Sequence, residues 1–302
     1  MQQRSGYVAI VGEPNVGKST LMNALLGQKI SIVTRKPQTT RQRVLGILTT
    51  GEAQIVFLDT PGLLRPKYLL HEKMVSAAQR ALEDADIVLV MTEPRSGADL
   101  PEPVAKLVLT RYGYKPLILC INKADTVFKD SLLPLIDAFA KGNVFREIVP
   151  VSALKHQNLD DLLKTLISYL PEHPALYPDD IVSDQTERFF VAELIREKIF
   201  DQFQEEIPYS TAVEINEFKE REEGKTYIQA TVVVERDSQK GILVGRRGAA
   251  LKKVGTSARA AIEEFVGKSV YLELRVKVGE KWRDKEAWMR RLGYQPHELT
   301  KA

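Results

Sequence analysis

Short apolar runs alternate with helical patterns along the first half of the chain. The runs are five or six residues long and predict strands at residues 7–11, 54–59, 87–91, 117–122 and 148–152. Apolar positions between them follow helical spacing, which predicts helices that include residues 19–26, 71–83, 102–112 and 159–170. This alternation is typical of an α/β fold with a mostly parallel sheet and helices on both faces. We therefore expect ligands beyond the carboxyl ends of the strands.

The pattern changes after the segment PEHPALYPDD, in which Pro171, Pro174 and Pro178 predict a semi-rigid linker. Beyond it we expect a helix, two strands, two helical stretches and a strand whose apolar residues alternate, at residues 186–203, 211–219, 226–235, 241–265 and 270–278. This order, α-β-β-α-α-β, predicts a second, α+β domain. The predicted divisions are an α/β domain over 1–173, a linker over 174–185, an α+β domain over 186–280 and a basic tail helix over 281–302.

Composition narrows the class of protein. The chain has 302 residues, of which 44% are hydrophobic, and this is enough for two cores of ordinary size. No apolar run approaches the length of a membrane span, and the first strand begins almost at the start, so we expect a cytoplasmic protein, and a monomer. The single cysteine, Cys120, lies in the apolar run LILCI and is expected to pack in a core.

Charge is unevenly distributed. The net charge is +3, but residues 240–294 contain 14 Lys and Arg against 6 Asp and Glu, a local balance of +8, so the rest of the chain sums to −5. A basic C-terminal third favours a polyanionic partner. A solvated charged surface with no partner would have the same composition.

The segment GEPNVGKST follows the first predicted strand and leads into a predicted helix. In a Gly-x-x-x-x-Gly-Lys-Ser loop of this kind, backbone N–H groups and the helix N-terminus converge on phosphate oxygens. Lys18 would reach the β- and γ-phosphates, and Ser19 would coordinate Mg²⁺. The predicted phosphate-binding residues are Gly12, Glu13, Pro14, Asn15, Val16, Gly17, Lys18, Ser19 and Thr20.

Three further motifs stand at strand ends and indicate a guanine nucleotide. In NKAD, the carboxylate of Asp125 can accept two hydrogen bonds from guanine, whereas adenine would be repelled. In DTPG, Asp59 fits a carboxylate that reaches Mg²⁺ through water, and the Gly62 N–H fits a γ-phosphate sensor. In VSAL, the Ala153 N–H could meet the guanine oxygen. The remaining predicted GTP-binding residues are Thr60, Pro61, Leu63, Asn122, Lys123, Ala124, Ser152 and Leu154.

The basic loop RKPQTTRQR offers Thr39 or Thr40 as a further Mg²⁺ ligand, and Thr40 is the preferred one. The predicted metal site is thus Ser19, Thr40 and Asp59. Small signalling GTPases orient the attacking water with a glutamine directly after their Asp-x-x-Gly motif, but Leu63 occupies that position here. Slow turnover is expected, with Lys18, Thr40 and Gly62 as catalytic groups.

The sequence GRRG follows GILV and opens a helix. A Gly-x-x-Gly loop lets a nucleic-acid backbone approach closely, and Arg246 and Arg247 would neutralise phosphates, as in the KH fold. A pair of helix-capping glycines would also explain Gly245 and Gly248. The predicted RNA-binding residues are Gly245, Arg246, Arg247, Gly248, Lys252, Lys253 and Arg259.

These motifs resemble the translation-factor-related GTPases and, most closely, the Era family. GEPNVGKSTLMNALLG, QTTRQR, LDTPGL, NKAD and VSAL are similar to that family's nucleotide motifs, and GILVGRRGAALKKVGTSAR with KVGEKWRD is similar to its RNA-binding half. The resemblance covers nearly the whole chain. It implies a GTP- and GDP-binding GTPase that requires Mg²⁺, with a type II KH domain that binds the 3′ end of 16S rRNA during assembly of the 30S ribosomal subunit.

Three alternatives stay open at this point. Related GTPases with asparagine at the position of Asn15 bind K⁺ there, so Asn15 is either a catalytic group that helps to hold K⁺ or a residue that caps the loop. The basic C-terminal part, with Trp288 in the tail, could instead dock on the inner face of the cell membrane as a peripheral protein. The third alternative is an ATPase motor, which is disfavoured because the carboxylate of Asp125 would repel adenine.

Overall fold

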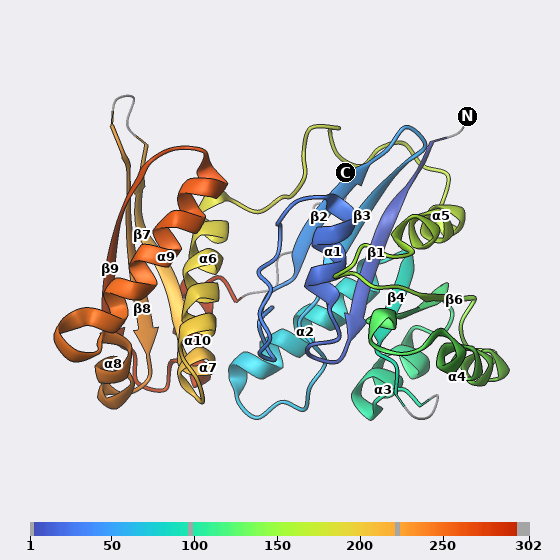
Figure 1. The fold of residues 1–302 in the computed structure, drawn as a ribbon, viewed down its shortest axis with the longest axis horizontal. Coiled ribbons are helices and arrows are strands. Elements are labelled where there is room, and N and C mark those ends of the chain that lie inside the picture. The colour runs from blue at the N-terminus through green and yellow to red at the C-terminus, as the bar shows by residue number, and fades with distance from the viewer. Residues whose placement is uncertain (1–2, 96–98, 221–223, 295–302) are drawn as a thin grey trace. The chain divides into compact units, whose positions relative to one another are not determined.

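The computed structural model describes residues 3–95, 99–220 and 224–294. Within these residues the chain forms two compact units (Figure 1). The first unit consists of the described residues up to 67 and of 71–184, and the second of 68–70 and 185–294. No helix in the described ranges is both long and apolar enough to cross a membrane.

The first unit is built on a six-stranded sheet with the order β2-β3-β1-β4-β5-β6. All neighbouring strands are parallel except β2 and β3, which are antiparallel. The mostly parallel α/β sheet expected from the sequence is therefore confirmed. The strands are β1 (Arg4–Gly12), β2 (Val44–Thr49), β3 (Ala53–Asp59), β4 (Ile87–Thr92), β5 (Leu117–Ile121) and β6 (Glu147–Pro150).

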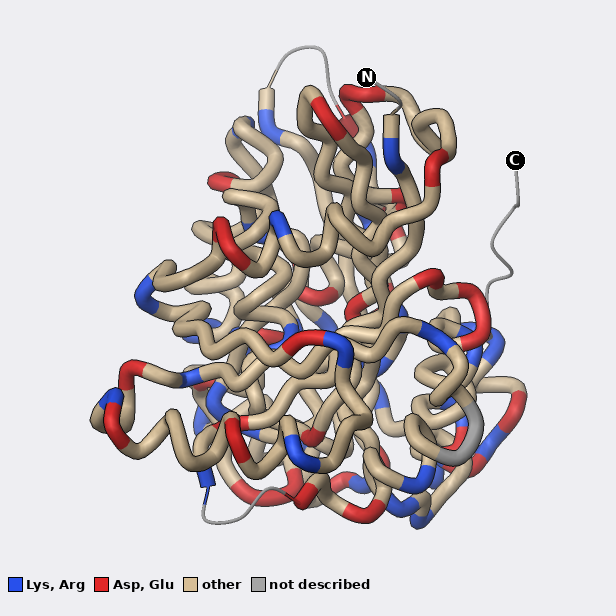
Figure 2. Tube along the Cα trace, turned by 90° about the vertical axis from the view of Figure 1, so that its right-hand side faces the viewer, with Lys and Arg blue, Asp and Glu red and all other residues tan. Residues whose placement is uncertain are grey.

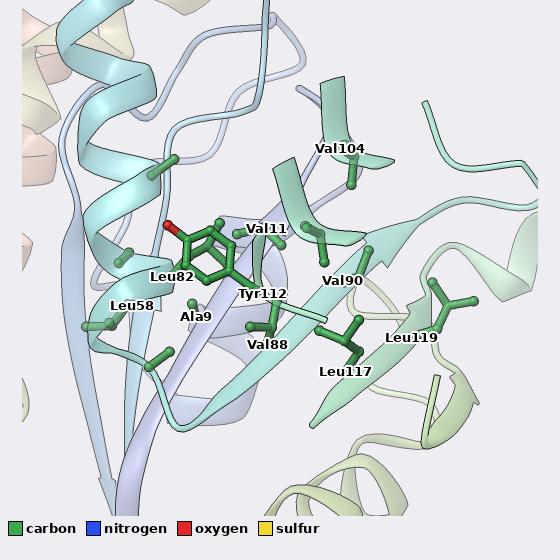
Figure 3. Packing of buried hydrophobic residues seen from close by; sticks show 14 of the residues in the cluster. Ala9, Val11, Leu58, Leu82, Val88, Val90, Val104, Tyr112, Leu117 and Leu119 are labelled. Carbon is green, nitrogen blue, oxygen red and sulfur yellow. The ribbon is translucent and has the colours of Figure 1, made fainter. Parts of the chain in front are cut away.

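Helices cover both faces of this sheet. Side chains of α2, α3 and α4 share one core cluster with the strands (Figure 3). Gly46, whose neighbours Leu45 and Ile47 belong to that cluster, points to the opposite face, where an added Cβ would lie 2.6 Å from Leu26 of α1. The helices are α1 (Lys18–Leu26), α2 (Leu69–Asp84), α3 (Glu102–Arg111), α4 (Lys129–Lys141) and α5 (Leu159–Tyr169), with a 3₁₀ turn η1 (Ala124–Thr126).

Strand β2 was not among the predicted strands. Gly46 interrupts its apolar run, and the strand is completed only by antiparallel pairing with β3 at the edge of the sheet. The neighbouring Pro-containing segment also differs from prediction, because residues 174–184 are bound to the first unit and are not a free spacer. Gln54 accepts hydrogen bonds from the Leu176 and Tyr177 N–H groups at 2.7 and 2.9 Å, and Ile47 N donates to the Val182 oxygen at 2.9 Å.

The second unit has a three-stranded sheet with the order β7-β8-β9, in which β7 and β8 are antiparallel and β8 and β9 parallel. The predicted α+β order is confirmed, with a short additional helix, α7. The elements are α6 (Glu187–Gln202), α7 (Ile207–Ser210), β7 (Ala212–Lys219), β8 (Thr226–Val234), α8 (Asp237–Val244), η2 (Arg246–Gly248), α9 (Ala249–Val266), β9 (Val270–Val278), η3 (Trp282–Asp284) and α10 (Glu286–Arg291).

The core of this unit follows the spacing of apolar residues. Val254, Ala258 and Ile262 are four residues apart on α9, and all three are fully buried. In β8 every second residue from Thr226 to Val232 is buried, which leaves the alternate positions half-buried. Thr186 caps α6 by accepting a hydrogen bond from the Phe189 N–H at 3.3 Å, so this helix begins where the sequence predicted.

The segment after β9 is part of the second unit's fold. Trp282 is fully buried, and its indole Nε1 donates to the Ser210 oxygen at 2.8 Å. Met289 of α10 is also fully buried. The basic helix predicted within 281–302 is present as the six-residue α10, preceded by the 3₁₀ turn η3, and both pack inward; residues 295–302 lie outside the described residues.

Replacing Trp282 with alanine is expected to destabilise the second unit by about 3–5 kcal/mol, because the change removes a large buried ring and a buried hydrogen bond. Urea unfolding of the whole chain, followed by circular dichroism, measures the loss. Arg290→Ala on the exposed side of α10 is the control and should change stability by less than about 0.5 kcal/mol. Equal stabilities of the Trp282 variant and the unmodified chain would show that the segment is a dispensable tail.

Candidate functional site

The loop between β1 and α1 has a backbone that only glycine accommodates at one key position. Gly17 has φ = 97°, and a Cβ there would lie 2.3 Å from Nδ2 of Asn122. The Asn122 amide donates to the Val16 oxygen at 2.8 Å and accepts from the Ala153 N–H at 3.0 Å. Asn122 at the end of β5 thus joins the glycine loop to the turn after β6, although the three segments are far apart in the sequence.

One backbone donor predicted for the base is occupied in this arrangement. The Ala153 N–H was expected to meet the guanine oxygen, but it donates to the Asn122 side chain instead. The physical reason is that the Asn122 side chain is buried and its amide oxygen needs a donor. The neighbouring Ser152 is buried too and accepts from the Lys155 N–H at 3.2 Å, which shapes the same turn.

Lys18 lies within the loop, and its side chain is buried. Its ammonium group donates to the backbone carbonyl oxygens of Glu13 at 2.8 Å and Gly12 at 3.4 Å. Burial lowers the pKa of Lys18 to about 8, although the charges of Asp59 and Glu13 partly oppose this shift. Phosphate oxygens would supply the compensating negative charge that the two carbonyl groups cannot.

The three predicted metal ligands converge on one point. Ser19 Oγ donates to Asp59 Oδ2 at 2.6 Å and lies 3.0 Å from Thr40 Oγ1. Asp59 is fully buried, and its other oxygen, Oδ1, has no hydrogen-bond partner among the described residues. Burial raises the pKa of Asp59. The hydroxyls around it and the charge of Lys18 oppose this rise. An orphaned carboxylate oxygen beside two hydroxyls fits a hard cation that binds oxygen ligands, such as Mg²⁺.

The structure distinguishes the two threonines of the basic loop. Thr39 Oγ1 is 2.7 Å from Thr34 Oγ1 and donates to the Lys36 oxygen at 2.8 Å, so its hydroxyl is used within the loop. Thr40 Oγ1 lies 3.0 Å from Ser19 Oγ, which places Thr40 at the predicted metal site. Within the described ranges, no cluster of three or more His, Cys, Asp and Glu side chains could hold a metal.

The segment after β3 is packed tightly on the glycine loop. A Cβ at Gly62 would lie 2.8 Å from the Pro14 nitrogen, so a larger residue would displace the loop. The Leu63 N–H donates to the Gly12 oxygen at 3.2 Å, and its side chain is buried in the core cluster. Leu63 was predicted to touch GTP, but its side chain points into the core because the apolar group is stabilised there. Thr60 likewise turns inward and donates to the Ile10 oxygen at 2.7 Å.

Asn15 has a left-handed backbone, with φ = 67°, and its side chain is exposed. Its Nδ2 donates to the Arg35 oxygen at 3.1 Å, so the amide links the glycine loop to the basic loop. Among the described residues, the structure shows no hydrogen bond to its Oδ1.

The NKAD motif lies at the other end of the site. Lys123 has a left-handed backbone, with φ = 62°, and its ammonium group pairs with Glu93 Oε2 at 2.5 Å. Asp125 lies in η1 with an exposed side chain. A second ion pair joins Arg95 to Glu13 at 2.9 Å. Glu93 and Arg95 follow β4 and were missed in the sequence, because that strand carries no motif, although its carboxyl end lies beside those of β1 and β5.

Sequence reasoning also missed polar groups that support the metal site. Ser31 is buried and donates to Asp59 Oδ2 at 3.1 Å, and Asn23 of α1 binds the backbone of Ser31. His71 of α2 is buried, and its Nε2 lies 3.1 Å from Oε1 of Gln38 in the basic loop. One signal was present: Asn23 follows Ser19 by four residues, which places both on one face of α1.

The GRRG loop of the second unit forms η2 between α8 and α9. Gly245 has φ = 72° and Gly248 has φ = 78°, and a Cβ at Gly245 would lie 2.6 Å from Cβ of Ala250. Arg247 also has a left-handed backbone, with φ = 51°. The loop therefore depends on its glycines, and both arginine side chains are exposed.

Five of the residues predicted to bind RNA carry a positive charge. Across the part of the chain that the structure describes, no acidic partner is found for Arg246, Arg247, Lys252, Lys253 or Arg259. Three arginines elsewhere in the unit, Arg275, Arg283 and Arg291, are in contrast paired with glutamates. Basic and acidic positions are interspersed along the trace (Figure 2). These five charges lie on the loop and on α9, the helix that follows it.

Comparisons with known proteins agree with this arrangement. Residues 7–123 match the family model described as 50S ribosome-binding GTPase, and residues 206–283 match the KH domain model. The chain is 41% identical over 300 residues to GTPase Era of Ruminiclostridium cellulolyticum, covering 99% of this chain and 100% of the relative. It is 45% identical over 298 residues to GTPase Era of Lacticaseibacillus paracasei, covering 99% of both chains.

Two solved structures are similar over nearly the full length. The first is Era in complex with MgGDPNP and nucleotides 1506–1542 of 16S ribosomal RNA, with 44% identity, a TM-score of 0.93 and coverage of 97% of this chain and 99% of that one. The second is a variant of Aquifex aeolicus Era bound to GDP·AlF4⁻, with 44% identity, a TM-score of 0.92 and the same coverage.

Proposed function

The chain belongs to the Era family of GTPases, and from this membership we propose that it is a GTP-driven switch that binds the 3′ end of 16S rRNA and acts in assembly of the small (30S) ribosomal subunit. The observation that supports the nucleotide half is the convergence of Ser19, Thr40 and Asp59 beside Lys18. The arginines of the GRRG loop, which are exposed and have no acidic partner among the described residues, support the RNA half.

In the first domain, the backbone N–H groups of the glycine loop and the Lys18 ammonium group would bind the phosphates. Ser19 and Thr40 would offer hydroxyl oxygens to Mg²⁺, and Asp59 would accept hydrogen bonds from its water. Mg²⁺, when bound, neutralises charge that develops between the β- and γ-phosphates. Asp125 would accept two hydrogen bonds from guanine, and the stem of Lys123, whose charge Glu93 binds, would lie along the base.

Hydrolysis must proceed without a glutamine side chain after the Asp-x-x-Gly motif. Leu63 is buried and cannot hold water, so the Gly62 N–H, Thr40 and Lys18 would position and stabilise the transferring group. Such a site lacks the added cation that an arginine provides in other GTPases. We propose that K⁺ supplies this charge next to Asn15, whose Nδ2 is engaged by the Arg35 oxygen.

GTP turnover is therefore expected to rise by about tenfold when K⁺ replaces Na⁺ at equal ionic strength, because one additional cation stabilises the transition state. Asn15→Ala should remove this difference. Phosphate release is measured in both salts with saturating GTP and Mg²⁺. Asn143→Ala, which also alters a left-handed asparagine but lies after α4, is the matched control. Equal rates of the unmodified chain in the two salts would leave Asn15 with the capping role.

In the second domain, the GRRG loop would hold the backbone of single-stranded RNA, and Lys252, Lys253 and Arg259 of α9 would extend the cationic surface. Membrane docking is not favoured by the observations on the tail. Trp288 is half-buried, a Cβ at Gly279 would lie 2.8 Å from its ring, and Arg291 pairs with Glu214. These side chains pack within the second unit, so we propose a site of action in the cytoplasm, on the ribosomal subunit.

A further inference from the structure

The carboxylate of Asp59 is held by a residue that belongs to none of the nucleotide motifs. Ser31, in the segment between α1 and β2, donates its hydroxyl to Asp59 Oδ2 at 3.1 Å. Only 4% of Ser31 is exposed, and the carboxylate that it binds is fully buried. Ser31 therefore has no solvent alternative for this hydrogen bond.

The position of Ser31 is in turn determined by α1. Oδ1 of Asn23 accepts hydrogen bonds from the N–H groups of Ile30 and Ser31, both at 2.9 Å, and its Nδ2 donates to the Ser31 oxygen at 2.7 Å. Ile30 and Ile32 on either side of Ser31 are buried. Three hydrogen bonds from one side chain and two buried neighbours thus fix Ser31 relative to the helix that carries Ser19.

The hydroxyls around Asp59 differ in what they can do once a metal is present. Ser19 and Thr40 are the proposed ligands, and their oxygens would turn toward Mg²⁺. Ser31 is not needed as a ligand, so its hydroxyl can stay on Oδ2 and leave Oδ1, which has no hydrogen-bond partner in the described part of the chain, directed to the water on the metal.

We propose that Ser31 is a positioning residue that orients Asp59 toward Mg²⁺, and that Asn23 holds Ser31 in place for this purpose. The inference rests on the proposed Mg²⁺–GTP site and adds to it a residue that touches Asp59 and not the metal. Loss of a group that orients a metal-binding carboxylate or its water commonly weakens metal binding by about 10- to 100-fold.

The test measures binding of a fluorescent GDPNP analogue to the full chain at a series of free Mg²⁺ concentrations and in EDTA. For Ser31→Ala, the Mg²⁺ concentration that gives half of the affinity gain is expected to rise by about 10- to 100-fold. The affinity in EDTA should stay within about twofold of that of the unmodified chain, since the variant keeps every group proposed to touch the nucleotide.

Further variants separate orientation from packing. Ser31→Cys preserves the size of the side chain but donates only weakly, so it should shift the Mg²⁺ midpoint in the same direction as Ser31→Ala. Asn23→Ala should also raise the midpoint. Ser168→Ala, which removes an exposed hydroxyl that bonds to the Thr165 oxygen, should leave it unchanged.

The results that would overturn the inference are distinct from those that would overturn the proposed function. An unchanged Mg²⁺ midpoint in Ser31→Ala, or an equal loss of affinity with and without Mg²⁺, would show that Ser31 only supports the fold of the loop. If the unmodified chain binds the analogue equally well in Mg²⁺ and EDTA, the proposed Mg²⁺ site fails, and the role of Ser31 fails with it.

Discussion

Asp125→Asn should lower the affinity for GTP by about 100-fold and raise the affinity for XTP, because the variant exchanges one of two hydrogen-bond acceptors for a donor. The carboxylate can accept from both the ring N–H and the exocyclic amine of guanine. The asparagine amide can instead accept from the ring N–H of xanthine and donate to the carbonyl that replaces the amine. The exchange thus reverses the preference without altering the phosphate loop.

Competition of GTP and XTP against a fluorescent guanine nucleotide measures this preference. Asp125 is exposed in η1, so its replacement leaves the core intact, and the variant should fold normally. Asp130→Asn removes the same charge from the exposed first turn of α4 and serves as the control. If the ratio of the two affinities is the same in Asp125→Asn and in the control, the assignment of the base site is wrong.

The double change Arg246→Asp and Arg247→Asp should abolish most RNA binding and leave GTP binding unchanged. Two cations without acidic partners in the described ranges become two anions at the point where phosphate is expected to pass. We expect RNA affinity to fall by about 100-fold. The slope of log affinity against log salt concentration should become smaller in magnitude by about 1.4, because each single-strand phosphate contact contributes about 0.7. Aspartate tolerates the left-handed backbone of residue 247, so the loop should still form.

Titration of single-stranded RNA at several salt concentrations, beside a GTP titration of the same sample, measures both effects. Lys225→Asp with Lys268→Asp changes the net charge of the second unit by the same amount at the far end of α9 from the loop and is the matched control. RNA affinity as high as that of the control would contradict the proposed RNA site. A simultaneous loss of GTP binding would show that the loop supports the fold.

The nucleotide motifs were predictable because each is a local pattern with a local cause. Glycines at residues 12 and 17, followed by Lys18 and Ser19, specify a loop whose backbone can bind phosphate, whatever the rest of the fold does. The apolar runs before the motifs predict strands, and the ends of parallel strands meet at one edge of the sheet. In the second unit, the glycines of GRRG predict a turn between two helices, and the structure places Gly245 and Gly248 at positive φ there.

The groups that support these motifs depended on contacts between distant segments. Ser31 and Asp59 are 28 residues apart, and only the folding of the loop over α1 brings the hydroxyl to the carboxylate. Thr40 and Thr39 are adjacent in the sequence but have different neighbours in space, because Thr40 lies at Ser19 and Thr39 donates to the Lys36 oxygen. Buried polar groups must find partners wherever the fold provides them, so Asn122 engages the Ala153 N–H.

Burial and long-range hydrogen bonds likewise determined where two segments of ambiguous composition pack. The sequence of the tail predicts a basic helix because charged residues dominate it. In the structure, its Trp282 and Met289 are fully buried in the second unit. The sequence of the proline-containing segment predicts a linker. In the structure, Gln54 binds this segment to the first unit through hydrogen bonds. Local patterns specified the turns, the strands other than β2 and the residue types of the motifs, because those depend on neighbouring residues. Its supporting contacts depend on which distant surfaces exclude water together, and only the folded chain determines that.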